Sequence, residues 1–294
     1  MLLNKHGSFY IRNGWPTKII NAINKDKLIF SPNRELDAVD TIGVGRVMVK
    51  ALRYWSTALG IAKEEKTTSG VSTSLTNLGE KIVEHDIFCQ DIGTLWLLHR
   101  YLVSSKEYAT AWYWAFNIYH SKSFTKEEFS TAFYSFVQRE GGNYQKTAVE
   151  KEFDCFKNTY VSDKAFDIEK IIEEDTVPFF APLRLLTYNS GVFERTKMSA
   201  KDIPTDILLY CIMMDNEETL KNKRQLSIDM LLEEPNQVGK YMNLTYAVLL
   251  ELLLQLENQG YIKVVNNFGN RHIEIITNST PVEILNNHYY ASER

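Results

Sequence analysis

The expected order of helices and hairpins repeats near the two ends of this 294-residue chain, and that repetition limits the folds it can adopt. Near the N-terminus, apolar residues at helical spacing and the turn residues between them predict three helices and then two short strands, at residues 15–26, 34–41, 46–59, 61–66 and 71–75. Three helices followed by a hairpin are typical of a winged helix-turn-helix module.

A second block with the same order begins at Pro204. It is predicted to contain helices at 206–215, 228–234, 237–242 and 245–259, and then strands at 261–265 and 272–276. The residues between the two strands include Asn267-Phe268-Gly269-Asn270, which is typical of a hairpin turn. The sequence therefore predicts a second winged helix in this block.

The stretch between the two blocks, from Leu78 to about Phe180, is interpreted as one helix after another. We therefore predict a mainly α protein in which two winged helix-turn-helix modules flank an all-helical middle domain. The predicted domains are an N-terminal winged helix at 1–80, a helical middle at 81–200, a C-terminal winged helix at 201–280 and a tail at 281–294.

Positive charge is concentrated at the N-terminal end of the chain. Residues 1–66 hold eleven lysine and arginine residues and six acidic residues, a local net charge of +5, whereas the whole chain has a net charge of −4. Residues 204–276 have the opposite balance, with six basic and ten acidic residues. This asymmetry indicates contact with a polyanion at the N-terminal end.

The expected helix at 46–59 carries two different faces. Met48, Leu52, Trp55 and Leu59 form an apolar stripe, and Arg46, Lys50, Arg53 and Thr57 follow the same offsets on another stripe. A recognition helix needs a core-facing back and a cationic front in the DNA groove. With Lys63 and Lys66 on the expected hairpin, these residues predict a surface that binds duplex DNA. The alternative is an ordinary solvated surface.

The long helix expected at 245–259 is rich in leucine and carries acidic residues, which suits a protein interface better than a phosphate backbone. Tyr246, Leu250 and Leu254 fall beside the face expected to pack on its own domain. We therefore expect them to contact a protein partner or a second copy of the chain. The alternative is that another part of the same chain covers this face.

No catalytic, cofactor or metal motif is evident in the sequence. The three cysteines, Cys89, Cys155 and Cys211, are far apart and form no CxxC pair, which argues against a structural zinc site and favours a reducing cytoplasm. Asp40 with Glu64-Glu65-Lys66 only faintly resembles the metal site of a nuclease. We therefore expect a cytoplasmic protein with no membrane span, metal or cofactor, and no enzymatic activity.

Several stretches resemble an uncharacterised bacterial family, domain of unknown function four-thousand-seven. They are His6-Gly-Ser-Phe-Tyr-Ile-Arg-Asn-Gly-Trp15, Ile42-Gly-Val-Gly-Arg-Val-Met-Val-Lys-Ala-Leu-Arg-Tyr-Trp55, Thr94-Leu-Trp-Leu-Leu-His99 and Ala109-Thr-Ala-Trp-Tyr-Trp-Ala-Phe-Asn117, with weaker similarity at 182–183 and 193–197. The family usually begins with Gly-His-Glu, whereas this chain has Lys5-His6-Gly7.

The resemblance implies a genomic setting more than an activity. Members tend to lie beside phosphoadenosine-phosphosulfate-reductase-like genes in DNA phosphorothioation and phage-defence clusters, and they supply no catalytic residues to carry over. The first hypothesis is a non-enzymatic DNA-binding component or regulator of such a system. The second is an adaptor that uses its winged helices to bind proteins, and the third, much weaker, is an uncatalogued nuclease.

Overall fold

The chain forms two compact units in the computed structural model, which describes residues 1–161, 177–267 and 270–292. Unit 1 comprises Met1–Trp114 and Ser121–Glu194, and unit 2 comprises Ala115–His120 and Arg195–Arg294.

Three parts of the sequence prediction lie outside the described residues. They are residues 162–176 of the expected helical middle, residues 268–269 of the expected hairpin turn and residues 293–294 of the expected tail. Within the part that is described, no helix is long and apolar enough to cross a membrane.

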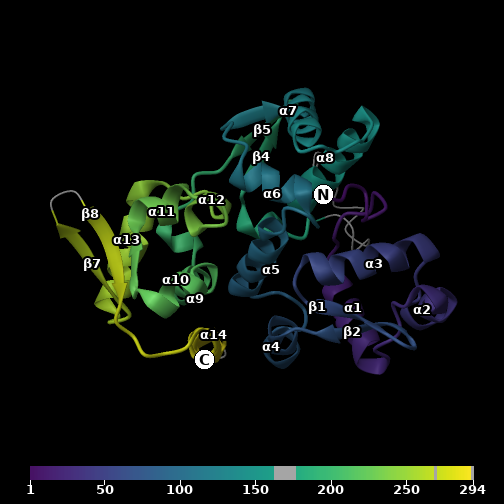
Figure 1. Ribbon diagram of the computed structural model, residues 1–294, viewed down its shortest axis with the longest axis horizontal. Coiled ribbons are helices and arrows are strands. Elements are labelled where there is room, and N and C mark those ends of the chain that lie inside the picture. Colours follow the sequence, from purple (N-terminus) through teal and green to yellow (C-terminus); the bar gives the residue numbers. More distant parts are fainter. Residues whose placement is uncertain (162–176, 268–269, 293–294) are drawn as a thin grey trace. The chain divides into compact units, whose positions relative to one another are not determined.

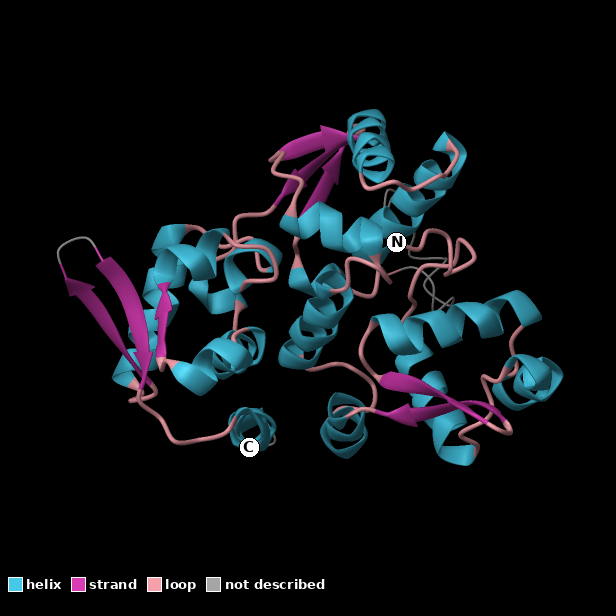
Figure 2. Cartoon of the chain, viewed as in Figure 1, coloured by secondary structure: helices cyan, strands magenta, loops and turns pink. Residues whose placement is uncertain are grey.

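Unit 1 begins with helices and a hairpin at the positions that the sequence predicts (Figures 1 and 2). These elements are α1 (Trp15–Lys25), η1 (Pro32–Arg34), α2 (Glu35–Ile42), α3 (Arg46–Ala58), β1 (Ala62–Thr67), β2 (Gly70–Leu75) and α4 (Asn77–His85). Strands β1 and β2 pair antiparallel, with Lys63 opposite Ser74 and Lys66 opposite Val71. Whether this arrangement belongs to the winged-helix class stays a prediction.

Helix α3 is anchored by one apolar face. Leu52, Trp55 and Leu59 are completely buried, as their spacing predicts, but Met48 is only half-buried and Val49 takes the core position in that turn. Burying each such side chain stabilises the fold by about 1.5–3 kcal/mol. The helix ends at Gly60, whose φ of +67° favours glycine and whose Cβ would meet the Tyr101 ring at 2.4 Å.

The rest of unit 1 shows that the predicted fold class was wrong. Its helices are α5 (Ile92–Ser104), α6 (Thr110–Asn117), α7 (Lys126–Arg139), α8 (Lys146–Tyr160) and the short η3 (Ala181–Leu183). Between and after them lie β3 (Ser123–Thr125), β4 (Leu186–Asn189) and β5 (Val192–Arg195), which form a three-stranded sheet in the order β3-β5-β4. The middle of the chain is therefore not all-helical, and the described protein is mixed α/β.

This small sheet contributes to an aromatic core. Phe193 on β5 stacks on Phe124 of β3 at 5.7 Å between ring centroids, and it meets Phe153 of α8 edge-on at 5.4 Å. Ser190 and Gly191 form the turn that joins β4 to β5, and both have positive φ, as a tight turn requires.

Unit 2 contains helices and a three-stranded sheet. Its elements are η4 (Ala200–Asp202), α9 (Thr205–Asp215), α10 (Glu217–Asn222), β6 (Gln225–Ser227), α11 (Ile228–Glu233), α12 (Val238–Tyr241), α13 (Tyr246–Asn258), β7 (Ile262–Asn267), β8 (Asn270–Ile275) and α14 (Pro281–Ser292). The strands lie in the order β6-β8-β7. The sequence predicted β7 and β8, but β6 was not anticipated.

Helix α14 forms in the segment that we described as a tail. It packs against α9 and buries Ile284, Leu285 and Tyr289. His288 Nδ1 also lies 2.9 Å from the Asp206 carboxylate at the start of α9.

Residues 115–120 belong to unit 2 although unit 1 surrounds them in the sequence. The Arg195 guanidinium donates hydrogen bonds to the carbonyl oxygens of Ala115 and Tyr119. The Asn236 N–H donates to Asn117 Oδ1 at 2.6 Å. These bonds fasten the short early segment to residues that come much later in the chain.

Candidate nucleic-acid interface

The predicted basic stripe lies on the solvent side of α3. Glycines at positions 43 and 45 separate this helix from α2, and Gly43 has a φ of +72°, so α3 starts abruptly with Arg46. Arg46 and Lys50 are strongly exposed, at 60% and 65% of their side chains. Arg53, one turn further on, is only 29% exposed.

Carboxylates of the same chain lie against these cations. Lys50 Nζ is 3.3 Å from Glu35 Oε1 on α2, and Arg46 Nε is 3.8 Å from the same oxygen. Arg53 forms a two-pronged pair with Glu64 of β1, in which Nε donates to Oε1 at 2.5 Å and Nη2 to Oε2 at 2.7 Å. The hydrogen bonds to Glu64 raise the pKa of Arg53. The local charge of the stripe is therefore much smaller than its cations alone suggest.

The two hairpin lysines, Lys63 and Lys66, lie on opposite faces of β1. Successive side chains of a strand point to opposite faces, so Lys66 lies on the face of β1 that carries Glu64, whereas Lys63 lies on the other face. Both lysines are exposed. Thr57 on α3 is half-buried, and its hydroxyl oxygen is buried. The structure thus brings Arg53 and Glu64 together and places Lys63 away from them.

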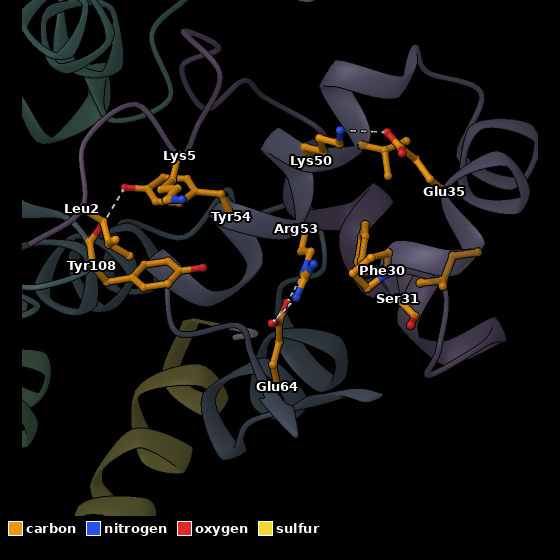
Figure 3. A pocket seen from close by; sticks show the side chains of 13 residues that line it. Leu2, Lys5, Phe30, Ser31, Glu35, Lys50, Arg53, Tyr54, Glu64 and Tyr108 are labelled. Atoms are coloured by element: carbon orange, nitrogen blue, oxygen red, sulfur yellow. Dashed lines mark hydrogen bonds and ion pairs between the residues drawn. The ribbon is translucent and has the colours of Figure 1, made fainter. Parts of the chain in front are cut away.

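A cavity of about 510 Å³ opens beside the stripe (Figure 3). It is lined by Leu2, Lys5, Ile29, Phe30, Ser31, Pro32, Glu35, Val49, Lys50, Arg53, Tyr54, Glu64 and Tyr108. Two of these, Lys50 and Arg53, were predicted to bind DNA. Lys5, Phe30, Tyr54 and Tyr108 were not singled out. Their positions in the sequence could have pointed to three of them. Tyr54 lies within one of the stretches that resemble the family, and Lys5 and Tyr108 directly precede two others.

Two stacked tyrosines form one wall of this cavity. The rings of Tyr54 and Tyr108 are nearly parallel, 7° apart, with centroids 5.2 Å apart. The Tyr54 hydroxyl donates to the Tyr108 carbonyl oxygen at 3.4 Å. Burial raises the pKa of both tyrosines, so their hydroxyls stay neutral at ordinary pH.

The N-terminal segment that carries Lys5 is held by buried polar contacts. His6 Nδ1 accepts a hydrogen bond from the Ser8 N–H at 3.1 Å, so the ring proton lies on Nε2, which is 3.2 Å from Glu152 Oε1. The Asn4 N–H donates to the same carboxylate. The side chains of both His6 and Glu152 are almost completely buried. These contacts fix Lys5 at the edge of the cavity, where its side chain is exposed.

The donor set in the cavity does not fit a metal ion. Its carboxylates, Glu35 and Glu64, are already paired with cations. Across the described ranges, no group of three or more His, Cys, Asp or Glu residues could hold a metal.

The residues that were expected to form a protein interface lie on α13 and differ in exposure. Leu254 is 42% exposed, whereas Leu250 and Tyr246 are half-buried. The Arg271 guanidinium of β8 lies over the Tyr246 ring at 4.7 Å and pairs with Asp229 at 3.2 Å. Part of the expected face is therefore covered within unit 2.

A family model matches residues 3–289, and the chain belongs to this family, which is described as "Protein of unknown function (DUF4007)". Two solved structures are similar in fold to the chain: "Magnesium ion-bound SspB crystal structure", with a TM-score of 0.83, and "SspB crystal structure", with a TM-score of 0.81. Each is 23% identical to this chain, and each alignment covers 98% of this chain and 88% of the other. No curated protein matches the chain.

Proposed function

We propose that this protein is a non-enzymatic DNA-binding component of a bacterial DNA-modification defence system. The observation that carries the proposal is the exposed cationic face of α3, where Arg46 and Lys50 lie on a helix anchored by Leu52 and Trp55. A rigid helix with cations on its outer face can neutralise backbone phosphates. Arg53 and Lys66 extend the proposed surface toward β1, whereas Lys63 and the buried Thr57 hydroxyl lie outside it.

The proposed setting rests on the family. The resemblance to this family implies a place beside phosphorothioation-type genes, and a DNA-binding component or regulator fits such a system. We propose no catalytic role for the chain. Glu35 and Glu64 form ion pairs with neighbouring cations of the same chain, which lowers the net positive charge of the site.

A salt titration tests the proposed DNA binding. The full chain should bind a fluorescent duplex at low salt with little sequence selectivity. The logarithm of the affinity should fall with the logarithm of salt concentration, with a slope of about −0.9 for each phosphate contacted. Absence of binding at low salt, or a flat salt dependence, would contradict the proposal.

Substitution of the two most exposed cations localises the binding surface. Arg46→Ala combined with Lys50→Ala should weaken binding and reduce the salt slope by up to about 2, since two phosphate contacts are lost. Folding should survive, because exposed changes usually cost within about 0.5 kcal/mol each. Lys146→Ala with Lys151→Ala removes two exposed cations from α8 and is the matched control. Equal loss in both variants would rule out a specific role for α3.

A second candidate function is a protein contact through α13, which the exposure of Leu254 favours. In this hypothesis Leu250 and Leu254 contact a partner or a second copy of the chain, with Tyr246 beside them. Leu250→Glu with Leu254→Glu should then lower the sedimenting mass of the self-associated protein without unfolding it. A wild-type chain that sediments as a monomer rules out self-association, and loss of folding in the variant indicates internal packing.

A further inference from the structure

The cavity beside α3 combines three kinds of chemistry within one small space. Tyr108 and Phe30 supply aromatic surface, Lys5 and Lys50 supply positive charge, and Glu35 and Glu64 supply hydrogen-bond acceptors. Its volume of about 510 Å³ lies in the range of ordinary small-molecule sites. Figure 3 shows Lys5 and the two tyrosines on one side of the cavity, with Phe30, Glu35 and Lys50 on the other.

This combination selects among possible ligands. Two carboxylates disfavour a ligand that is only an anion, such as inorganic phosphate, because like charges repel. Two nearby lysines and an aromatic wall equally disfavour a ligand that is only a cation. A nucleotide has all the complementary parts, since its base stacks on aromatic rings, its base N–H groups donate to carboxylates and its phosphate pairs with lysine.

Only part of this lining is open to such a ligand. Glu35 Oε1 is buried and lies 3.3 Å from Lys50 Nζ, and Glu64 already accepts two hydrogen bonds from Arg53. The Lys5 side chain is exposed at the edge of the cavity. A phosphate placed between Lys5 and Lys50 would leave the half-buried Tyr108 ring for the base.

The cavity is continuous with the proposed DNA surface. Lys50 and Arg53 belong to the cationic stripe of α3 and also line the cavity. A duplex whose phosphates lie along this stripe therefore passes its opening. One nucleotide turned out of the base stack would enter without the backbone leaving the cations.

We propose that this cavity receives a single unstacked nucleotide of the bound DNA, an inference that rests on the proposed DNA binding. The base lies against Tyr108, whose other ring face is backed by Tyr54. Lys5 and Lys50 bind the phosphate. Unpaired or damaged positions are then preferred, because their bases are already released from the stack.

The first test uses isolated nucleotides and the full chain. Calorimetric titrations compare deoxyadenosine monophosphate with deoxyribose 5-phosphate and with inorganic phosphate. The nucleotide should bind about tenfold more tightly than the sugar phosphate, the gain expected from one stacked base. Equal affinities would overturn the inference, because the base would then contribute nothing.

The second test uses DNA with one bulged adenine against the same duplex without it. The bulged duplex should bind severalfold more tightly. Leu2→Trp, which fills the cavity, and Tyr108→Ala should each abolish this ratio, whereas Tyr108→Phe should keep it. Lys146→Ala with Lys151→Ala should leave the ratio unchanged. A ratio that survives Leu2→Trp in a folded protein, as judged by its thermal melting, would overturn the inference.

The two tests separate this inference from the proposed function. The protein could bind the bulged and the plain duplex equally well and show no preference for the nucleotide over the sugar phosphate. That result would leave the proposed function intact and the inference wrong. No duplex binding together with selective nucleotide binding would contradict the proposed function. It would also assign the cavity to a free nucleotide, which overturns the inference as stated.

Discussion

At the scale of single residues, the charge of the candidate interface depends more on ion pairs within the chain than on the number of lysine and arginine residues. Residues 1–66 carry a net charge of +5. In the fold, Glu35 lies against Lys50 and Arg46, and Glu64 holds Arg53 with two hydrogen bonds. Under the proposed DNA binding, these carboxylates would compete with backbone phosphates for the same cations.

Removing one competitor should strengthen DNA binding. Glu64→Gln keeps the shape of the side chain but cannot form the ion pair, so Arg53 becomes available to a phosphate. We expect severalfold tighter binding and a salt slope that steepens by up to about 0.9. Fluorescence titrations at several salt concentrations measure both quantities.

Glu80→Gln on α4 is the matched control for the loss of one negative charge from an exposed position. If both variants strengthen binding equally, only the overall charge matters. Unchanged binding in Glu64→Gln would show that Arg53 does not reach DNA.

At the scale of elements, the sequence predicted the helices and hairpins that have strong periodicity and clear turns. It missed the sheet of unit 1 because β3 has only three residues, too few to show alternation. Thr125 also closes a capping box with Glu128, so this stretch has the signature of a helix start. The partner strand β5 comes about 70 residues later, and single-sequence patterns do not reveal pairing over that distance.

The candidate site was predictable to a similar extent. The cations of α3 follow from helical spacing, since the apolar residues fix which face is buried. The carboxylates that oppose them come from α2 and β1, and the cavity walls come from five separate segments of unit 1. Packing of separate segments decides such contacts, so local sequence patterns could not supply them.

The importance of the missed sheet can be measured at Phe193. Phe193→Ala removes a buried ring that contacts Phe124 and Phe153, and it should destabilise unit 1 by about 3–5 kcal/mol. Tyr188→Ala on the neighbouring strand is the control, since this ring is 37% exposed and should cost about 1 kcal/mol or less. Denaturant unfolding monitored by circular dichroism gives both values. Similar small costs would mean that the sheet is peripheral to the core.

At the scale of the whole molecule, unit 2 depends on its last helix. Helix α14 covers α9 and buries Ile284, Leu285 and Tyr289. Helix α9 has little choice of partner, because almost all of its side chains from Ile207 to Ile212 are apolar and buried. A helix that is apolar all around must be covered on every side.

Ending the chain after Thr280 should therefore unfold unit 2. The loss is about 1.5–3 kcal/mol for each of the three buried side chains, which is comparable to the stability of a small domain. Scanning calorimetry should show that the transition of unit 1 remains while that of unit 2 disappears. Ending the chain after Tyr290 is the control and should change little, because it keeps the three buried side chains and the first residue that it removes, Ala291, is exposed. A stable unit 2 without α14 would contradict this assignment.

The early placement of residues 115–120 has a consequence for synthesis on the ribosome. Arg195, which binds the Tyr119 carbonyl oxygen, follows it by 76 residues. At ordinary elongation rates of about 5–20 residues per second, Arg195 is made roughly 4–15 s after Tyr119. During that interval residues 115–120 lack this later partner, while the second part of unit 1 is still being translated. The synthesis of the two units is thus interleaved, and unit 2 can close only after α14 has been made.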